Sequence, residues 1–308
     1  MTRNRITVLV LMGGPDAERE VSLMSGKETA QALRDCGRFE VIEHIIDDPS
    51  VDELGELGGD VVFPVLHGPW GEGGHLQERL ELLGKPFVGS PSDAARLAMD
   101  KLATKTLLSA DGIPTPAAQR LAADDVCTIP PPLVLKPIDD GSSIDLFICR
   151  TEQEVNEARA ALHPKRNIIM AEKYIAGREL TVGIVQDKPL PLIEIVPAVE
   201  FYDYDAKYFR NDTRYKLDPD VPADVAKRCA EISMHAFDRL GCRDLARVDL
   251  MLDDAGLWFL EINTMPGFTT HSLVPMAAAH AGLDMPELCA TLVQAALARS
   301  PIAAAGTR

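Results

Sequence analysis

The sequence lacks the features that mark membrane proteins and disulfide-rich proteins. No apolar run approaches the ~18 residues that a membrane-spanning helix requires. The apolar stretch at residues 6–12 leads directly into Gly13-Gly14-Pro15-Asp16, without the small-residue cleavage pattern of a signal peptide. The six cysteines are scattered and form no C-x-x-C pair, which favours reduced thiols over a disulfide frame or a zinc site. These absences predict a cytoplasmic protein with no membrane partner.

Basic residues are scarce relative to acidic ones. The chain has 31 Lys and Arg against 47 Asp and Glu, which gives a formal net charge of −16. A surface this acidic repels the phosphate backbone of nucleic acids, so no nucleic-acid partner is expected. Two nucleotide-binding motifs are also missing, because the sequence contains neither G-x-G-x-x-G nor G-x-x-x-x-G-K-[ST]. The chain therefore has no P-loop, and a dinucleotide-dependent dehydrogenase is disfavoured.

What the sequence does contain is an alternation of strand and helix patterns. At about 150 residues per domain, 308 residues predict two domains, or three small ones. The first part reads as a parallel sheet with helices on its faces, with Ser22 available to cap the first helix. Its predicted elements, which end near residues 89–92, are strands 6–12, 41–46 and 61–66 and helices 21–33 and 76–83. Beyond it we expect helices 99–110 and 151–162, strands 133–136, 146–149 and 168–172, and a third unit from about residue 180.

A lysine stands at the end of a predicted buried strand, just before a small-residue turn. Lys136 is followed, after four residues, by Gly141-Ser142-Ser143. Backbone N–H groups and hydroxyls of such a turn can surround phosphate oxygens, and the lysine adds a positive charge. Taken alone, an ordinary β-turn with a solvent lysine is the simpler interpretation.

Two later strands flank Asp253-Asp254-Ala255-Gly256 and predict a β-hairpin. A three-residue loop ending at Gly256 pairs Asp253 with Leu257, and the two-residue period of a strand then places four polar side chains on one face: Arg247, Asp249, Glu261 and Asn263. Opposed carboxylates repel unless a cation lies between them, and oxygen ligands favour Mg²⁺ or Mn²⁺ over zinc. The alternative is a diagonal Arg247–Glu261 salt bridge on a solvated face. The other face is expected to be core: Val248, Leu250, Leu252, Leu260 and Ile262.

Two loops at strand ends add candidate ligand residues. The glycine-rich segment that begins at His67 follows a strand and precedes a helix, where α/β sheets place ligand loops. For a single histidine, a tight turn that leaves the side chain exposed is the more frequent explanation and is expected here. Glu18, after the first strand, could bind a substrate ammonium group or could simply be an acidic residue at a helix start.

Taken together, these segments resemble the D-alanine–D-alanine ligase family of the ATP-grasp superfamily. The similar segments keep the family's order and cover nearly the whole chain: GGPDAEREVSLMSG (13–26), LHGPWGEGGHLQ (66–77), MDKLATK (99–105), KPIDDGSS (136–143), EKYIAGRELTV (172–182), FYDYDAKY (201–208), ARVDLML (246–252) and EINTMPGFTTHSLVPMAA (261–278). The last segment is highly specific to this family.

The resemblance implies an α/β protein whose N-terminal parallel domain precedes a two-lobed ATP-grasp fold of the α+β type. Three domains are expected: a Rossmann-like domain at 1–92, a central ATP-grasp subdomain at 93–176 and a C-terminal subdomain at 177–308. The Tyr- and Asp-rich stretch 201–216 is the expected lid, which would protect an acyl phosphate from water.

The resemblance also implies a role for each matched residue. ATP would be bound by Lys101, Lys136, Ser143, Glu172, Lys173, Ile175, Glu179 and Lys207. The first D-alanine and its acyl phosphate would be held by Glu18, Ser142, Tyr208, Arg247 and Gly267, with His67 nearby. The second D-alanine would be received by Ser272 and Leu273, and two Mg²⁺ or Mn²⁺ ions by Asp249, Glu261 and Asn263. The implied reaction joins two D-alanines through a D-alanyl phosphate for the peptidoglycan precursor, and a homodimer is expected.

The chain departs from the family pattern at two places. Ile144-Asp145 stands where a small residue and a glycine are usual, which adds a negative charge beside the expected phosphates, and Gly73 replaces an acidic residue. The charge of Asp145 leaves a catalytically weak ATP-binding homologue as one alternative. Independently of these departures, a ligase that joins D-alanine to D-lactate or another D-amino acid is the other.

Overall fold

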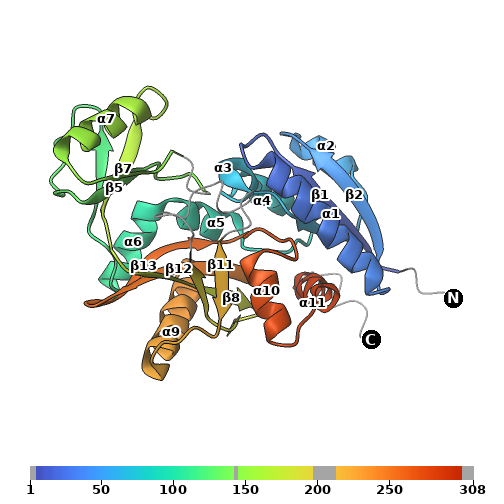
Figure 1. Cartoon of the computed structure of the whole chain (residues 1–308). Coiled ribbons are helices and arrows are strands. Elements are labelled where there is room, and N and C mark those ends of the chain that lie inside the picture. Colours follow the sequence, from blue (N-terminus) through green and yellow to red (C-terminus); the bar gives the residue numbers. More distant parts are fainter. Residues whose placement is uncertain (1–4, 142–144, 197–212, 300–308) are drawn as a thin grey trace.

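The computed structural model describes residues 5–141, 145–196 and 213–299, and it contains three β-sheets (Figure 1). The first sheet is parallel, with strand order β2-β1-β3, as the alternation of strands and helices predicts. Its strands are β1 (Thr7–Gly13), β2 (Glu40–Ile46) and β3 (Val61–Pro64). The accompanying helices are α1 (Arg19–Asp35), α2 (Val51–Glu56), α3 (Gly68–Gly71) and α4 (His75–Leu82).

The turn from β1 into α1 depends on two glycines and one serine. Gly13 and Gly14 have φ angles of 102° and 90°, and a Cβ on Gly13 would lie 2.6 Å from the Ile46 carbonyl oxygen. Ser22 does not cap α1, which corrects the expectation from the sequence. It lies inside the helix, where its Oγ accepts a hydrogen bond from the Gly13 N–H at 2.9 Å and donates one to the Val65 carbonyl. Ser22 therefore ties α1 to the ends of β1 and β3.

The second sheet is antiparallel, with order β4-β7-β5-β6. Its strands are β4 (Ala118–Ala122), β5 (Leu133–Lys136), β6 (Phe147–Cys149) and β7 (Ile168–Lys173), and α7 (Glu152–Leu162) packs against it. The helix expected at 99–110 is preceded by another one, so that α5 (Ser92–Met99) is followed by α6 (Lys101–Ala110). Asp100 separates them because it leaves the helical conformation and accepts a hydrogen bond from the Ala103 N–H at 2.9 Å.

The third sheet has six strands in the order β11-β10-β8-β12-β13, with β9 beside β8. The strands are β8 (Arg178–Val185), β9 (Lys188–Pro189), β10 (Ile193–Val196), β11 (Arg214–Leu217), β12 (Leu245–Asp253) and β13 (Gly256–Asn263). The helices α9 (Ala223–Leu240), α10 (Leu273–His280) and α11 (Met285–Ala298) complete the chain. Figure 1 shows α11 beside α1, and the two share one apolar core with β1 and β3. Among the described residues, no helix combines the length and the apolar character needed to cross a bilayer.

The β12–β13 hairpin has the predicted pairing at its polar end and a different pairing at its turn. Asp249 lies opposite Glu261 and Arg247 opposite Asn263, as expected. At the turn, however, Asp253 pairs with Gly256 and not with Leu257, and an irregularity next to Asp249 restores the register.

This irregularity also changes which side chains of β13 enter the core. Phe259, opposite Leu250, is fully buried, whereas Leu260, which was expected in the core, is only half-buried. Val248, Leu250 and Ile262 lie in the core as predicted, and Leu252 packs against it partly exposed.

An ion pair between half-buried Arg299 and buried Asp244 joins the residue after α11 to the link between the first and second sheets. The guanidinium of Arg299 contacts both oxygens of Asp244 at 2.5 and 2.6 Å and donates a hydrogen bond to the Phe87 carbonyl at 3.2 Å. The Asp244 side chain is only 2% exposed, and its Oδ2 also accepts from the Gly89 N–H at 2.8 Å. The pair therefore holds residues 87–89 against the start of β12.

We expect Arg299→Ala to lower the free energy of unfolding by about 2–3 kcal/mol, because it leaves a buried carboxylate without its cation. The control is Arg38→Ala, which removes a similar Arg–carboxylate contact to Glu287 at an exposed site and should cost less than about 1 kcal/mol. Urea denaturation measures both values. Equal losses of unfolding free energy in the two variants would show that the Arg299–Asp244 pair stabilises the fold no more than an exposed pair does.

Candidate active site

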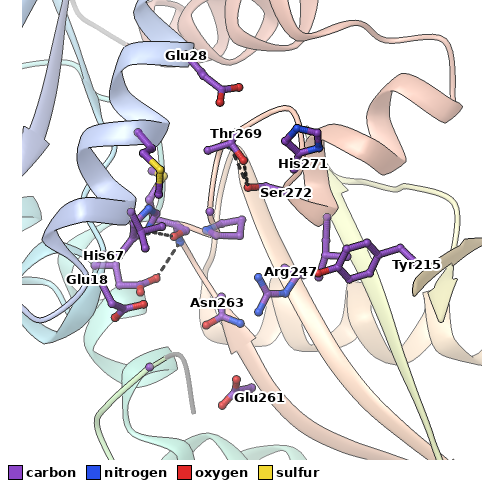
Figure 2. A pocket seen from close by; sticks show the side chains of 18 of the residues that line it. Glu18, Glu28, His67, Tyr215, Arg247, Glu261, Asn263, Thr269, His271 and Ser272 are labelled. Carbon is purple, nitrogen blue, oxygen red and sulfur yellow. Dashed lines mark hydrogen bonds between the residues drawn. The ribbon is translucent and has the colours of Figure 1, made fainter. Parts of the chain in front are cut away.

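A cavity of about 380 Å³ opens between the N-terminal sheet, the hairpin of the third sheet and α10 (Figure 2). Its lining combines residues from both ends of the chain. Eight of the residues singled out in the sequence are among them: Glu18, His67, Arg247, Glu261, Asn263, Gly267, Ser272 and Leu273. Residues more than 200 positions apart thus meet in one pocket that carries both acidic and basic groups.

The first wall of the cavity comes from the loops that follow β1 and β3. Glu18 is buried and directly precedes α1. His67 is also buried, and its Nδ1 lies 3.0 Å from the Met265 carbonyl oxygen. Because burial lowers the pKa of His67 to about 4, the imidazole is neutral at physiological pH. The expectation of an exposed histidine in a tight turn is therefore wrong.

The opposite wall contains the N-terminus of α10. Ser272 directly precedes this helix, and its Oγ accepts a hydrogen bond from the Thr269 N–H at 3.0 Å. Figure 2 shows Ser272 and Thr269 beside one another at the rim of the cavity. The unpaired N–H groups at the start of a helix attract anions, so this wall suits a carboxylate.

The polar face of the hairpin forms the floor of the cavity. Arg247 donates from Nε and Nη2 to the two oxygens of Asp249, each at 2.9 Å. Thr181, on β8, donates to Asp249 Oδ1 at 2.7 Å, and the Asn263 amide lies 3.4 Å from Oδ2. Glu261 contacts the Lys101 ammonium at 3.5 Å. Each hairpin carboxylate is thus paired with a cation.

The hairpin side chains suit a hard divalent cation. Two carboxylates and one amide oxygen lie on one sheet face, and these are ligands that Mg²⁺ and Mn²⁺ prefer. In the part of the chain that the structure describes, no group of three or more His, Cys, Asp and Glu side chains is arranged so that it could hold a metal ion by itself. A metal here would therefore depend on the amide of Asn263 and on oxygens supplied by bound phosphates.

A buried carboxylate joins two buried lysines, one of which is Lys136, a predicted ATP ligand. Glu172 on β7 contacts Lys136 at 2.7 Å through Oε2 and Lys105 at 2.6 Å through Oε1. Burial alone would raise the pKa of Glu172, but Lys105 and Lys136 together hold it below its ordinary value. Burial likewise opposes the charge of Lys136, but Glu172 and Glu261 keep its pKa above the ordinary value. The cluster is therefore charged, and it links the second sheet to the hairpin.

Lys105 is a site residue that the sequence reasoning missed. Its ammonium is buried, and besides Glu172 it donates a hydrogen bond to the Phe259 carbonyl at 3.1 Å. Its spacing of four residues from Lys101 on one helix was the available signal, since residues four apart lie on the same face.

Other predicted residues lie at or outside the margin of this arrangement. The Lys173 side chain is exposed, Ile175 is buried, and Glu179 is half-buried on β8. Ser142, Ser143, Lys207 and Tyr208 lie outside the described residues, as does most of the expected lid at 201–216.

Glu72 is a second site residue whose importance only the structure reveals. It is buried beside Glu18 in the cavity lining and accepts hydrogen bonds from the N–H groups of Gly68 at 3.2 Å and Met265 at 3.3 Å. Burial, together with the neighbouring Glu18, raises the pKa of Glu72 to about 8. Glu72 is therefore largely protonated at neutral pH, and it joins the β3–α3 turn to the segment that follows β13.

We expect Glu72→Gln to flatten the pH dependence of stability. The folded protein holds a proton on Glu72 that the unfolded chain releases above its ordinary pKa, so the free energy of unfolding falls as pH rises from about 4.5 to about 8. Glutamine mimics the protonated acid and removes this fall. Urea denaturation across that pH range tests it, with Glu56→Gln, at an exposed position on α2, as the control. If the free energy of unfolding of Glu72→Gln falls with pH as steeply as that of the wild type, Glu72 is not the group that holds the proton.

Comparison with known proteins identifies the family of this chain. The family model described as D-ala D-ala ligase C-terminus matches residues 113–294, and the model described as D-ala D-ala ligase N-terminus matches residues 50–90. The chain belongs to the D-alanine–D-alanine ligase family. The resemblance drawn from the sequence motifs is thereby confirmed.

Individual members of the D-alanine–D-alanine ligase family are similar over nearly their whole length. The chain is 42% identical to D-alanine–D-alanine ligase B of Chromobacterium violaceum over 92% of this chain and 95% of that protein. It is 43% identical to the D-alanine–D-alanine ligase of Bordetella petrii over 93% and 91%.

Solved structures of the D-alanine–D-alanine ligase family share the fold. The Bacillus anthracis enzyme, complexed with ATP, has a TM-score of 0.84 and 32% identity, and the match covers 96% of this chain and 98% of that one. The Coxiella burnetii enzyme also has a TM-score of 0.84, at 26% identity, with 98% and 97% covered. The predicted fold class, an α/β domain followed by an ATP-grasp fold, is confirmed.

Proposed function

We propose that this protein is an ATP-dependent ligase that joins two D-alanines through a D-alanyl phosphate, for peptidoglycan precursor synthesis in the cytoplasm. The cavity carries the proposal, because it combines an acid for an ammonium group, a guanidinium and a helix N-terminus beside a nucleotide-type lysine cluster. The family membership supports the same reaction. The predicted homodimer stays a prediction.

In this proposal the first D-alanine lies between Glu18 and Arg247. The Glu18 carboxylate binds the ammonium group of this D-alanine. The carboxylate of the D-alanine faces Arg247 and the Gly267 backbone. This carboxylate attacks the terminal phosphorus of ATP and displaces ADP, which forms the D-alanyl phosphate. The activation is needed because a free carboxylate is too poor an electrophile to react with an amine. The Arg247 guanidinium then stabilises the negative charge that spreads over the transferred group.

The second D-alanine lies at the N-terminus of α10. Its carboxylate accepts hydrogen bonds from Ser272 and the Leu273 backbone, which directs its amine toward the acyl phosphate. His67, which is assigned to the first D-alanine, is neutral and adds no positive charge to the site. Attack on the acyl carbon releases phosphate and forms the peptide bond.

ATP is assigned to the lysine cluster between the second sheet and the hairpin. Lys101 and Lys136 bind phosphates, Glu172, Lys173 and Ile175 line the adenine pocket, and Glu179 binds the ribose. Asp249, Glu261 and Asn263 would hold Mg²⁺ or Mn²⁺, which would neutralise phosphate charge during transfer. The roles assigned to Ser142, Ser143, Lys207 and Tyr208 belong to the same proposal.

A coupled assay of phosphate release tests this function. We expect phosphate and dipeptide in equal amounts with ATP and D-alanine, and no phosphate above background with L-alanine. Addition of D-lactate in competition with D-alanine should still give mainly the dipeptide. If D-alanyl-D-lactate is the main product, the depsipeptide alternative is favoured. If the protein binds ADP but releases no phosphate, the weak ATP-binding homologue is favoured.

A further inference from the structure

One face of α1 lines the cavity over several turns. Glu18, which directly precedes the helix, and Val21, Met24 and Glu28 all belong to the cavity lining. Their spacing of three or four residues places them on the same side of the helix. Glu18, assigned to the ammonium group of the first D-alanine, stands at one end of this face. Glu28 stands at the other end, about 15 Å further along the helix axis at 1.5 Å per residue.

Glu28 contacts the chain that leads into α10, which we call the α10-entry segment (residues 268–272). Its Oε2 accepts a hydrogen bond from the Thr270 N–H at 2.7 Å, across 242 positions of sequence. One turn earlier on α1, Ser25 Oγ accepts a hydrogen bond from the Phe268 N–H at 3.1 Å. Two residues of α1 therefore hold two alternate N–H groups of the α10-entry segment.

The two ends of this attachment are supported differently. Ser25 and Phe268 are buried, and the Phe268 ring packs against Phe63 with 5.7 Å between the ring centroids. Thr270 is exposed and Glu28 is half-buried. The apolar core thus fixes the first end of the α10-entry segment, whereas the hydrogen bond to Glu28 holds the Thr270 backbone against α1.

Thr269 lies between the two anchored residues, and it holds Ser272. The Thr269 N–H donates to Ser272 Oγ at 3.0 Å, and the two hydroxyl oxygens lie 2.9 Å apart. The Ser272 N–H donates in return to the Thr269 carbonyl at 2.9 Å. Figure 2 shows Glu28, Thr269 and Ser272 at the same end of the cavity. Movement of Thr270 would displace Thr269, and the Ser272 hydroxyl would turn with it.

We propose that Glu28 is a positioning residue for the second substrate, which acts through the α10-entry segment on Ser272. The inference rests on the proposed function, which assigns the carboxylate of the second D-alanine to Ser272 and Leu273. Glu18 and Glu28 then place both substrates relative to one rigid helix, the first by direct contact and the second through the α10-entry segment. This arrangement sets the separation between the attacking amine and the acyl phosphate.

Steady-state kinetics of dipeptide formation test the proposal, with one KM fitted for each D-alanine. Glu28→Ala removes the acceptor for the Thr270 N–H and should raise the KM for the second D-alanine about five- to tenfold. The KM for the first D-alanine and the KM for ATP should stay within about twofold of wild type. Glu28→Gln keeps an oxygen acceptor at the same position and should restore most of the lost affinity for the second D-alanine.

Hydrogen–deuterium exchange of the free protein gives a readout that does not depend on turnover. In Glu28→Ala, peptides that cover the α10-entry segment should exchange faster, whereas peptides from β12 should exchange as in the wild type. The matched control is Asp35→Ala, which removes a carboxylate from an exposed position of the same helix, where it accepts a hydrogen bond from Gln31 at 2.8 Å. This variant should change neither the exchange of the α10-entry segment nor either KM for D-alanine.

Three results would overturn the inference. The first is an unchanged KM for the second D-alanine, or unchanged exchange of the α10-entry segment, in Glu28→Ala. The second is an equal rise in both KM values for D-alanine, because a general distortion of the cavity would produce it. The third is a loss in Glu28→Gln as large as that in Glu28→Ala. Failure of the proposed function looks different, because the wild type would then form no dipeptide, and this would overturn both conclusions.

Discussion

Arg247→Met is expected to lower kcat for phosphate release by about 10³-fold, because it removes the guanidinium beside the transferred group. In the structure this guanidinium lines the cavity and is held in one orientation by its two hydrogen bonds to Asp249. Its charge is therefore placed before the substrate arrives, which is the condition under which electrostatic stabilisation is most effective. The measurement is the steady-state rate of phosphate release with saturating ATP and D-alanine.

Two companion measurements separate chemistry from folding in this variant. Loss of Arg247 leaves Asp249 buried without its cation, which should cost about 3 kcal/mol of stability. Arg247→Lys keeps a positive charge but not the paired hydrogen bonds. Compared with Arg247→Met, it should therefore restore more of the stability than of the rate of phosphate release. Mg-ADP affinity should stay within about threefold of wild type in both variants. A folded Arg247→Met enzyme with near-wild-type kcat would refute the role of this residue.

Glu261→Gln is expected to raise the Mg²⁺ concentration for half-maximal activity at least about tenfold and to lower kcat about 10²-fold. The physical reason is the loss of one of two carboxylates on the hairpin face. A second consequence involves Lys101, whose ammonium lies 3.5 Å from Glu261 and would lose this ion pair. Direct measurement of Mn²⁺ binding by electron paramagnetic resonance gives a readout that does not depend on turnover.

The matched control for Glu261 is Asp254→Asn, which removes one carboxylate from the exposed tip of the same hairpin. It should change neither Mn²⁺ affinity nor rate. Wild-type Mn²⁺ affinity in Glu261→Gln would show that the hairpin acids serve only as partners for Arg247 and Lys101.

The hairpin shows both the strength and the limit of sequence-based prediction here. Strict alternation along β12 identified a polar face and a core face correctly, because a strand places successive side chains on opposite sides. The predicted loop was one residue too long, yet Asp249 still faces Glu261 because the irregularity near Leu250 compensates for the difference. Turn length and bulge depend on packing across the sheet, which the local sequence does not encode.

Long-range contacts account for what the sequence did not predict. The spacing of Lys105 from Lys101 placed it on the same helix face, but its pairing with Glu172, on a strand 67 positions later, was not visible in the sequence. The same is true of Glu72, whose raised pKa results from burial beside Glu18. By contrast, the first sheet was predictable because its short β-branched runs and intervening helices define a parallel sheet locally. Site composition followed from motifs, but side-chain pairing required the structure.

Transfer of oxygen from the substrate to phosphate tests the central claim most directly. The account requires the carboxylate of the first D-alanine to attack ATP, so one of its oxygens must leave with the released phosphate. With D-alanine labelled with oxygen-18 in its carboxyl group, mass spectrometry should find one labelled oxygen in each phosphate formed together with dipeptide. Unlabelled phosphate at full turnover would contradict the acyl phosphate route and the roles assigned to Glu18 and Arg247.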